Sequence, residues 1–347
     1  MKTIIVKEKE AGQSLYKLLK KYLNKAPASF FYKMLRKKNI TLNGKKAQGK
    51  ERLQAGDEIC LFLSDETIAG FTERKKVSRV KEPKLEVIYE DAHILLVNKP
   101  AGLLSQKASP GDISLVEHVI SYLLKTGQLC KEELQSFRPG ICNRLDRNTS
   151  GLVAAGKSLA GLQSMNALFQ KRSLHKYYRC IVAGSILEPR RVEGWLEKEE
   201  KTNQVQIYKQ KREGALPICT EYRPLQTLTL EGRPYTYLEV NLITGRSHQI
   251  RAHLAGMGHP LIGDTKYGDA EINEYFRKHY GLKHQLLHAY RLELPVLTGT
   301  LCELSGKSFT ASMPPLFTKL LKGATYGNLE FQRTSRLNPR RTHQSNQ

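Results

Sequence analysis

The sequence predicts an α+β protein in which a small basic module precedes a larger, strand-rich domain. Residues 190–240 consist of successive short strands, with Gly and Pro marking the turns between them. Amphipathic patterns over residues 14–23 and 158–172 predict helices outside this stretch. Residues 65–84 are polar and charged with little periodicity, which is typical of a linker. A separate strand-rich region is typical of the α+β class, and 347 residues are ample for one large domain plus a small one.

Positive charge dominates the composition. The chain has 56 Lys and Arg against 33 Asp and Glu, a formal net charge of +23 and a pI of about 9.7. Such an excess indicates a polyanionic partner. A membrane surface is the competing polyanion, but the sequence has no apolar run of about eighteen residues and no basic helix with an aromatic-rich face. We therefore expect a nucleic acid partner and no membrane association.

The cysteines give no sign of a metal site or a disulfide framework. All six are scattered, without a C-x-x-C pair or a histidine pairing, which fits a reducing compartment. The apolar segment within MKTIIVKEKE is too short for a signal peptide. We expect a cytoplasmic protein without a bound metal.

Residues 1–64 form the basic module. Between Ser14 and Lys50 the chain has eleven Lys or Arg and no acidic residue. The helix over residues 14–23 is followed by a break, a second helix that ends near Lys38, and short strands. Such a run of charge is commonly a solvated helix face, and RNA binding is the reading that the net charge favours.

Residues 141–157, ICNRLDRNTSGLVAAGK, contain the candidate catalytic carboxylate. Asp146 stands between Arg144 and Arg147, and each cation favours its ionised form. The Thr-Ser-Gly that follows is typical of a tight polar turn leading into a strand. An isolated Asp in a charged loop is most often a surface residue, so this pattern alone leaves both interpretations open.

The same segment also satisfies a phosphate-binding pattern. Gly151 to Ser158, GLVAAGKS, has the spacing of a P-loop. A true P-loop follows a buried apolar strand and opens a helix, whereas residues 141–150 are too polar for such a strand. No apolar run leads into an Asp that would hold Mg²⁺. A P-loop NTPase is therefore the weaker alternative.

Three motifs together resemble those of the RluA-type pseudouridine synthases. NRLDRNTSGLVAAGK is similar to the family's HRLD-x-x-TSG signature, and KYYRCIVAG at 176–184 is similar to its K-x-Y motif. The stretch from Thr244, TGRSHQIRAHL followed by GMGHPLIGDTKYG, resembles its third motif, and NKPAG at 98–102 is a further landmark. The resemblance implies that Asp146 is catalytic and that Tyr178 is the active-site tyrosine. It also implies a curved, mixed, mainly antiparallel sheet with a central active-site cleft.

The chemistry of this family needs few groups. Converting uridine to pseudouridine breaks a bond from the sugar to nitrogen and forms a carbon–carbon bond, so the reaction requires no cofactor. It needs a carboxylate that acts as nucleophile or base. The sequence leaves open whether Asp146 attacks the sugar, attacks the base or removes a proton. We expect Arg251 to pair with Asp146 and keep it ionised, and Tyr178 to offer the base a stacking face.

Further residues are expected to face RNA, because the target base must be extruded from its stack into the site. We expect Arg144 to occupy the space that the base leaves, and Arg147, Arg246 and His248 to contact the RNA. His248 and His253 are five residues apart and lack cysteine partners. We interpret them as structural or RNA-facing rather than as metal ligands.

The basic module has a resemblance of its own. Over residues 12–64, its helix, break, basic helix and ITLNGKK…LQAGDEI resemble the RNA-binding module named for small-subunit ribosomal protein S-four. This resemblance implies that the module binds RNA. The candidate contacts are Lys33, Arg36, Lys37 and Lys38.

The resemblance covers nearly the whole chain. It predicts a module at 1–64, a linker at 65–84, a catalytic domain at 85–330 and a basic, disordered tail at 331–347. It implies isomerisation of specific uridines in structured RNA, most often large-subunit ribosomal RNA and otherwise transfer RNA, and we expect a monomer. A non-catalytic RNA-binding protein is the alternative, to which only Asn143, in place of the family's His, points.

Overall fold

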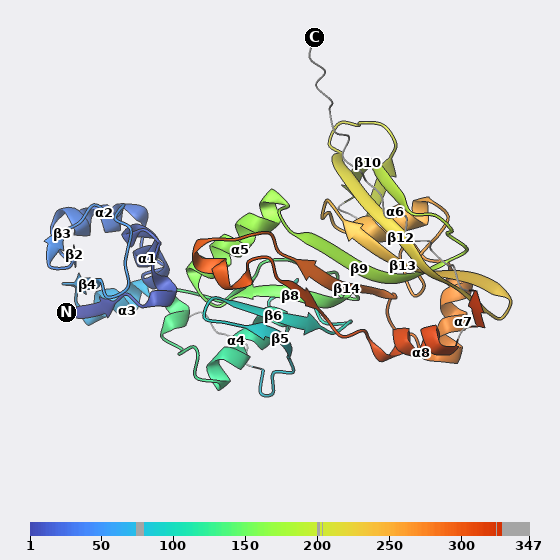
Figure 1. The fold of residues 1–347 in the computed structure, drawn as a ribbon. Coiled ribbons are helices and arrows are strands. Elements are labelled where there is room, and N and C mark those ends of the chain that lie inside the picture. Colours follow the sequence, from blue (N-terminus) through green and yellow to red (C-terminus); the bar gives the residue numbers. More distant parts are fainter. Residues whose placement is uncertain (74–79, 200–201, 203, 324, 328–347) are drawn as a thin grey trace, which may run out of the picture.

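The computed structural model describes residues 1–73, 80–199, 202, 204–323 and 325–327. The predicted tail at 331–347 and the middle of the predicted linker lie outside these residues. The described chain forms two β-sheets, each with its own hydrophobic core. Figure 1 shows the smaller, N-terminal part (blue) beside the larger body that carries the main sheet.

The N-terminal module is a four-stranded sheet with helices packed on it. The strand order is β1-β4-β2-β3. Leu18 of the first helix and Phe31 of the second are fully buried in its core. The elements are β1 (Lys2–Ile5), η1 (Glu8–Glu10), α1 (Leu15–Tyr22), α2 (Ala28–Arg36), β2 (Ile40–Leu42), β3 (Lys45–Lys46), β4 (Glu58–Leu61) and α3 (Asp65–Phe71).

Helix α3 differs from the sequence expectation, which placed residues 65–71 in a linker. The Ser64 hydroxyl accepts a hydrogen bond from the Thr67 amide at 3.2 Å and so caps the helix. Ile68 is buried in the module core. A helix of two turns with a single buried apolar residue has too weak a periodicity to be recognised from sequence.

The main sheet has twelve strands, mostly antiparallel. Its path is β11-β10-β12-β13-β9-β14-β8-β6-β5, with β15, β16 and β7 pairing beside it. The predicted α+β class with a mixed, mainly antiparallel sheet is confirmed. The strands are β5 (Glu86–Glu90), β6 (Ile94–Lys99), β7 (Gly140–Ile141), β8 (Ser150–Gly156), β9 (His175–Ala183), β10 (Arg190–Glu199), β11 (Gln204–Tyr208), β12 (Leu216–Leu230), β13 (Arg233–Leu242), β14 (Leu287–Glu293), β15 (Ser308–Thr310) and β16 (Thr325–Gly327).

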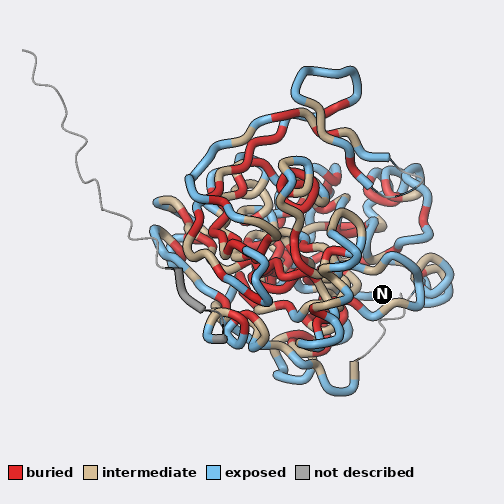
Figure 2. Tube along the Cα trace, turned by 90° about the vertical axis from the view of Figure 1, so that its right-hand side faces the viewer, coloured by how far each residue is buried: buried red, intermediate tan, exposed pale blue. Residues whose placement is uncertain are grey.

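Helices cover both faces of this sheet. Cys180 of β9 belongs to a core shared with α4 and α6, whereas its neighbour Ile181 packs in a separate core with α7 and α8. This alternation is the period of two expected of a strand buried on both faces, and Figure 2 shows the buried residues in the middle of the molecule. None of the described helices is long and apolar enough to cross a membrane. The helical elements are α4 (Leu115–Lys125), η2 (Glu133–Gln135), α5 (Leu159–Lys171), α6 (Gln249–Gly256), α7 (Ala270–Tyr280), η3 (Gly299–Leu304) and α8 (Pro315–Gly323).

Strand β14 lies between β8 and β9 and is parallel to β8. The two parallel strands approach most closely at Gly151, which has a φ of +116° and pairs with Ala289. A Cβ atom on Gly151 would lie 2.2 Å from the Ala289 carbonyl oxygen, so only glycine fits here. Strand β8 begins directly after the Asp146 loop. The close packing at Gly151 therefore fixes the backbone at the end of this loop against β14.

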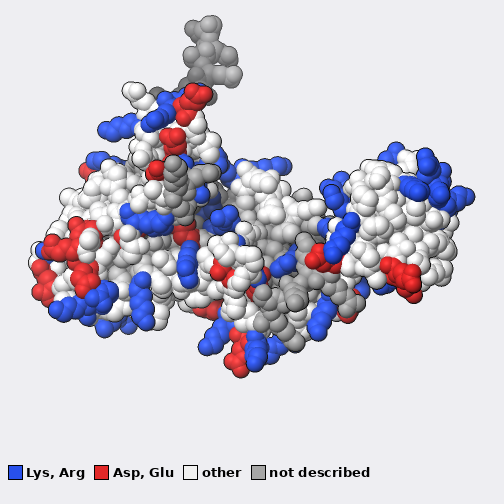
Figure 3. Space-filling view, turned by 180° about the vertical axis from the view of Figure 1, so that it is seen from behind, with Lys and Arg blue, Asp and Glu red and all other residues white. Residues whose placement is uncertain are grey.

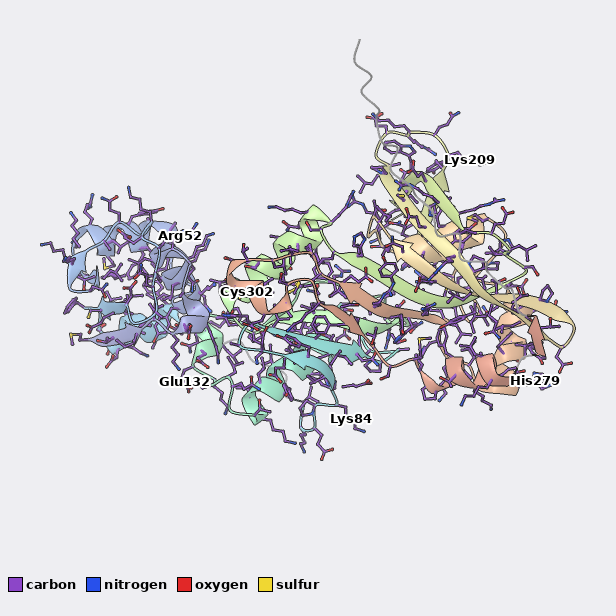
Figure 4. All side chains as sticks on the ribbon, viewed as in Figure 1. Arg52, Lys84, Glu132, Lys209, His279 and Cys302 are labelled. Atoms are coloured by element: carbon purple, nitrogen blue, oxygen red, sulfur yellow. The ribbon has the colours of Figure 1, made fainter. Side chains whose placement is uncertain are left out.

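The module contacts the main domain through η1. Lys7 Nζ lies 3.2 Å from Glu133 Oε1, and Lys9 donates a hydrogen bond to the Gln128 carbonyl. Ser136 donates a hydrogen bond to the buried carboxylate of Glu10. Figure 4 labels Glu132, which belongs to the same segment of the main domain. The module is thus packed against the main domain in addition to being joined by the intervening chain.

Candidate active site

Asp146 lies in the loop between β7 and β8. The Thr149 amide donates to the Asp146 carbonyl at 3.1 Å and closes the turn. The Ser105 hydroxyl donates to the Leu145 carbonyl at 2.7 Å, while the Leu145 amide donates back to it at 3.0 Å. The Asp146 side chain is 26% exposed, so its carboxylate is fixed by a bonded loop yet open to solvent.

A buried lysine joins this loop to the NKPAG segment. Lys99 is fully buried, and its Nζ donates to the carbonyls of Pro100, Leu103 and Arg147 at 2.8–3.1 Å. These bonds use all three ammonium protons. Burial lowers the pKa of Lys99 to about 7, although the negative charge of Asp146 opposes this effect.

The sequence neighbours of Asp146 do not supply its ion pair. Arg147 turns toward the NKPAG segment, where its Nε donates to the Gly102 carbonyl at 3.2 Å. Arg144 is exposed. Among the described residues, neither flanking arginine forms an ion pair with Asp146.

Arg251 of α6 supplies the ion pair instead. Its Nη1 donates to Asp146 Oδ2 at 2.9 Å. Its Nε and Nη2 donate to the two carboxylate oxygens of Asp264, each at 2.7 Å. Arg251 thus uses one edge of its planar fork for a bidentate pair and presents one further donor to Asp146.

Asp264 anchors this arrangement. Its side chain is fully buried, and the amides of Lys266 and Tyr267 donate to it. Burial alone raises the pKa of a carboxyl, but the hydrogen bonds and charge of Arg251 outweigh burial and lower the pKa of Asp264. Burial likewise opposes a rise in the pKa of Arg251, which the two carboxylates nevertheless raise. Arg251 and Asp264 therefore stabilise each other's charged forms.

His248 faces Asp146 from the start of α6. Its Nε2 lies 3.9 Å from Asp146 Oδ2, which is beyond hydrogen-bond distance. The Tyr267 hydroxyl accepts from the Val205 amide at 2.8 Å and lies 2.9 Å from His248 Nδ1. The phenol proton is therefore free to be donated to Nδ1, which places the imidazole proton on Nε2, toward Asp146. Burial lowers the pKa of His248, and the charge of Asp146 opposes this.

The backbone of His248 is unusual. It has the left-handed values φ 55° and ψ 11° at the N-cap of α6. Such a conformation is uncommon outside glycine and is found where surrounding structure holds a functional side chain. The strain is thus localised at the residue that projects toward Asp146.

Tyr178 of β9 is 8% exposed and belongs to the same hydrophobic core as Leu145, the residue before Asp146. Burial raises the pKa of the Tyr178 phenol, and the charge of Asp146 raises it further. The hydroxyl therefore keeps its proton at neutral pH. Most of the ring is occupied by core contacts, so only a small part of its surface is open to a base.

The other predicted residues fall into two groups. Arg246 lies in the loop before α6, near the site, and is half-buried. Asn143 lies behind the loop, where its side chain accepts from the Ala154 amide at 2.8 Å and donates to the Leu152 carbonyl at 3.2 Å. The candidates of the module are all exposed on or just after α2: Lys33, Arg36, Lys37 and Lys38.

Sequence reasoning assigned no role to three residues of this site: Lys99, Asp264 and Tyr267. Each lies in a motif that was recognised, NKPAG or GDTKYG. Their membership of these motifs was the available signal. Among the described residues no group of three His, Cys, Asp or Glu is placed to hold a metal ion.

Comparison with known proteins decides the family. A model of RNA pseudouridylate synthases matches residues 93–256. Ribosomal large subunit pseudouridine synthase C of Vibrio vulnificus is 30% identical over 295 residues, which cover 82% of this chain and 85% of that protein. The chain belongs to the RNA pseudouridine synthase family. The protein of the same name in Escherichia coli is 28% identical over 309 residues, covering 84% of this chain and 88% of that protein.

The fold agrees with this membership. Human RNA pseudouridylate synthase domain containing 4 superimposes with a TM-score of 0.53 at 23% identity, covering 68% of this chain and 92% of that chain. Its membership of the family makes this pseudouridine synthase an isomerase that acts on RNA. The two alternatives from sequence are wrong: the family is enzymatic, and residues 151–156 of the apparent P-loop form the buried strand β8.

Proposed function

We propose that this pseudouridine synthase isomerises uridines in large-subunit ribosomal RNA, with Asp146 as the nucleophile or base. The observation that carries the catalytic assignment is that Asp146 pairs with Arg251 at 2.9 Å while its side chain stays partly exposed. A partly exposed carboxylate is a group that can attack a sugar or base or accept a proton. The ribosomal substrate is supported by the names of the relatives, and transfer RNA is the second candidate.

The other residues act around Asp146. Arg251 holds the carboxylate in place, and the edge of Tyr178 that remains exposed contacts the extruded base. Arg144 is exposed in the same loop and fills the space that the base leaves in the RNA. The remaining contacts to RNA near the site come from Arg147, Arg246 and His248.

The N-terminal module binds the body of the RNA. Its candidate contacts Lys33, Arg36, Lys37 and Lys38 are all exposed, and Figure 3 shows Lys and Arg gathered over the outer end of the module. Such a surface attracts phosphates without reading sequence. We place the functional boundary between this module and the catalytic domain in the segment after α3, and expect a cytoplasmic monomer.

Tritium release from RNA that carries 5-tritiated uridine tests the catalytic assignment. Asp146→Asn keeps the shape of the side chain but removes the nucleophilic oxygen, so release should become undetectable while RNA binding is retained. Measurable turnover by the pure variant would show that another group performs the chemistry. Mapping pseudouridines in ribosomal RNA with and without this gene identifies the substrate, and an unchanged ribosomal map would favour transfer RNA.

A further inference from the structure

Lys176 of β9 is a half-buried cation without a counter-ion. Side chains alternate along a strand, so Lys176 leaves β9 on the face of Tyr178, two residues further on. In the described part of the chain no hydrogen-bond acceptor or carboxylate contacts its ammonium group. Burial, together with the positive charge of Arg172, lowers the pKa of Lys176 to about 8. The folded protein alone therefore disfavours this charge.

The ammonium group lies beside the loop that leads into α6. A Cβ atom on Gly245 would lie 3.3 Å from Lys176 Nζ, which is closer than ordinary contact. Gly245 is exposed and has no left-handed φ, so its backbone does not require glycine. The missing side chain thus keeps the ammonium group of Lys176 uncovered.

Arg246, the next residue in this loop, is also unsatisfied. Its Nε is buried from solvent and has no hydrogen-bond partner among the described residues. Three other half-buried or buried cations of the main domain have a carboxylate partner: Lys157 with Glu90 at 2.7 Å, Arg179 with Glu239 at 2.9 Å and Arg251 with Asp264 at 2.7 Å. Within the described chain, the buried Nε of Arg246 lacks an acceptor, which is costly, and the half-buried Lys176 has no carboxylate beside it. These two residues therefore suit a ligand that brings its own negative charge.

We propose that Lys176 and Arg246 bind a phosphate group of the substrate RNA beside the catalytic loop, and that Gly245 lacks a side chain so that this phosphate reaches Lys176. A phosphate offers the acceptor oxygens that both side chains lack, with Lys as a point charge and Arg as a directional donor. This inference rests on the proposed function, since it takes RNA as the ligand. The bound phosphate would hold the backbone of the RNA strand whose uridine enters the site.

The test compares RNA binding by full-length variants as a function of salt. The probe is a transcript of large-subunit ribosomal RNA, titrated between about 50 and 200 mM monovalent salt. Lys176→Met should weaken binding roughly tenfold at the lower salt and reduce the slope of log affinity against log salt by roughly 0.7–0.9. Lys176→Arg should keep the slope. The matched control is Lys319→Met, because Lys319 is exposed on α8, which covers the opposite face of the sheet.

Gly245→Ala tests the same contact from the other side. Its methyl group should partly cover Lys176 and weaken binding by several-fold, without altering the backbone. In the Lys176→Met background the same change should have no further effect, because the ammonium group it covers is already absent. Additive losses in the double variant would show that Gly245 acts independently of Lys176 and would overturn that part of the proposal.

A structural role for Lys176 predicts a different result. If Lys176 is structural, Lys176→Met should lower the melting temperature and leave the slope of log affinity against log salt unchanged. These two results together would overturn the proposal. Removal of an unpaired, half-buried charge should instead leave the melting temperature equal or higher. Tritium release by the wild-type protein is measured in parallel. If the wild-type protein releases no tritium, the proposed function is refuted. If the wild-type protein is active but Lys176→Met has the same salt slope as the wild type, only this inference is refuted.

Discussion

Arg251 is the single side chain on which two carboxylates depend. Asp264 is fully buried while Asp146 is 26% exposed. Without Arg251, Asp146 regains a partner in water, but among the described residues the Asp264 carboxylate keeps only the amides of Lys266 and Tyr267. Loss of Arg251 should therefore lower folding stability mainly through the buried Asp264, and lower activity through Asp146.

Arg251→Ala should lower the free energy of unfolding by about 3–5 kcal/mol, the usual cost of leaving a buried charge without its partner. It should also remove most activity. Arg251→Lys should restore part of both, because an ammonium group cannot make the bidentate pair and reach Asp146 together. Urea unfolding and tritium release measure the two effects separately.

Asp264→Asn in the Arg251→Ala background provides the control. It removes the uncompensated charge, so the double variant should be more stable than Arg251→Ala while remaining inactive. Equal stability of the two proteins would mean that Asp264 is not the source of the loss.

At the scale of elements, the parallel pair of β8 and β14 contains a buried histidine. His288 is fully buried; its Nδ1 lies 2.8 Å from the Ser150 hydroxyl and its Nε2 lies 3.4 Å from the Ala311 carbonyl. The carbonyl can only accept, so Nε2 carries the proton and Nδ1 accepts from Ser150. This neutral imidazole joins the first residue of β8 to β14 and to the chain that follows β15.

Folding stability should depend on the pH through His288. Burial lowers its pKa from 6.5 to about 4, although the bond to Ala311 opposes this. The unfolded chain therefore binds a proton that the folded chain does not, and stability should fall as the pH drops from about 6.5 to about 4, then level off. The total loss of folding free energy is roughly 3.5 kcal/mol, at about 1.4 kcal/mol per pKa unit.

Chemical unfolding at several pH values measures this dependence. His288→Gln should flatten it between pH 6.5 and pH 4, at some cost in stability at neutral pH. His279→Gln is the matched control, since His279 is exposed on α7 and is labelled in Figure 4. If the two variants show the same pH profile, the dependence arises from other groups.

Some of these elements were predictable from sequence and others were not. The helix expected at 158–172 is α5 and the strand expected at 176–184 is β9, because their apolar periods are strong. The position of β14 between β8 and β9 was not predictable, since strand order depends on packing between distant segments. The motifs named Asp146 and Arg251, but the support of Arg251 by Asp264 is a matter of three-dimensional distance.

At the scale of the whole molecule, the contact made by η1 orients the N-terminal module. A module tied only by a linker would sample many positions, whereas Lys7 and Glu10 are bonded to Glu133 and Ser136. The basic surface on α2 and the site at Asp146 are therefore held at a set separation. An RNA that is bound by both must present its phosphates and its target uridine at that separation.

Removal of residues 1–73 tests this arrangement. The main core around β9 has no member from the module, so the truncated protein should stay folded by circular dichroism. Its binding to large RNA should weaken, and the slope of log affinity against log salt should fall by roughly 0.7–0.9 for each phosphate that the truncated protein no longer neutralises. An unchanged slope would mean that the module does not touch RNA.

Strand β14 also sets the time at which the protein becomes active during its synthesis. The Asp146 loop with β8, and β9 with Tyr178, are synthesised before the strand that lies between β8 and β9, which begins only at Leu287. Until then the facing edges of β8 and β9 have no partner, and unpaired edges are where chains associate wrongly. A nascent chain that ends just before Leu287 therefore contains Asp146, Tyr178 and Arg251 but lacks the strand that brings β8 and β9 together.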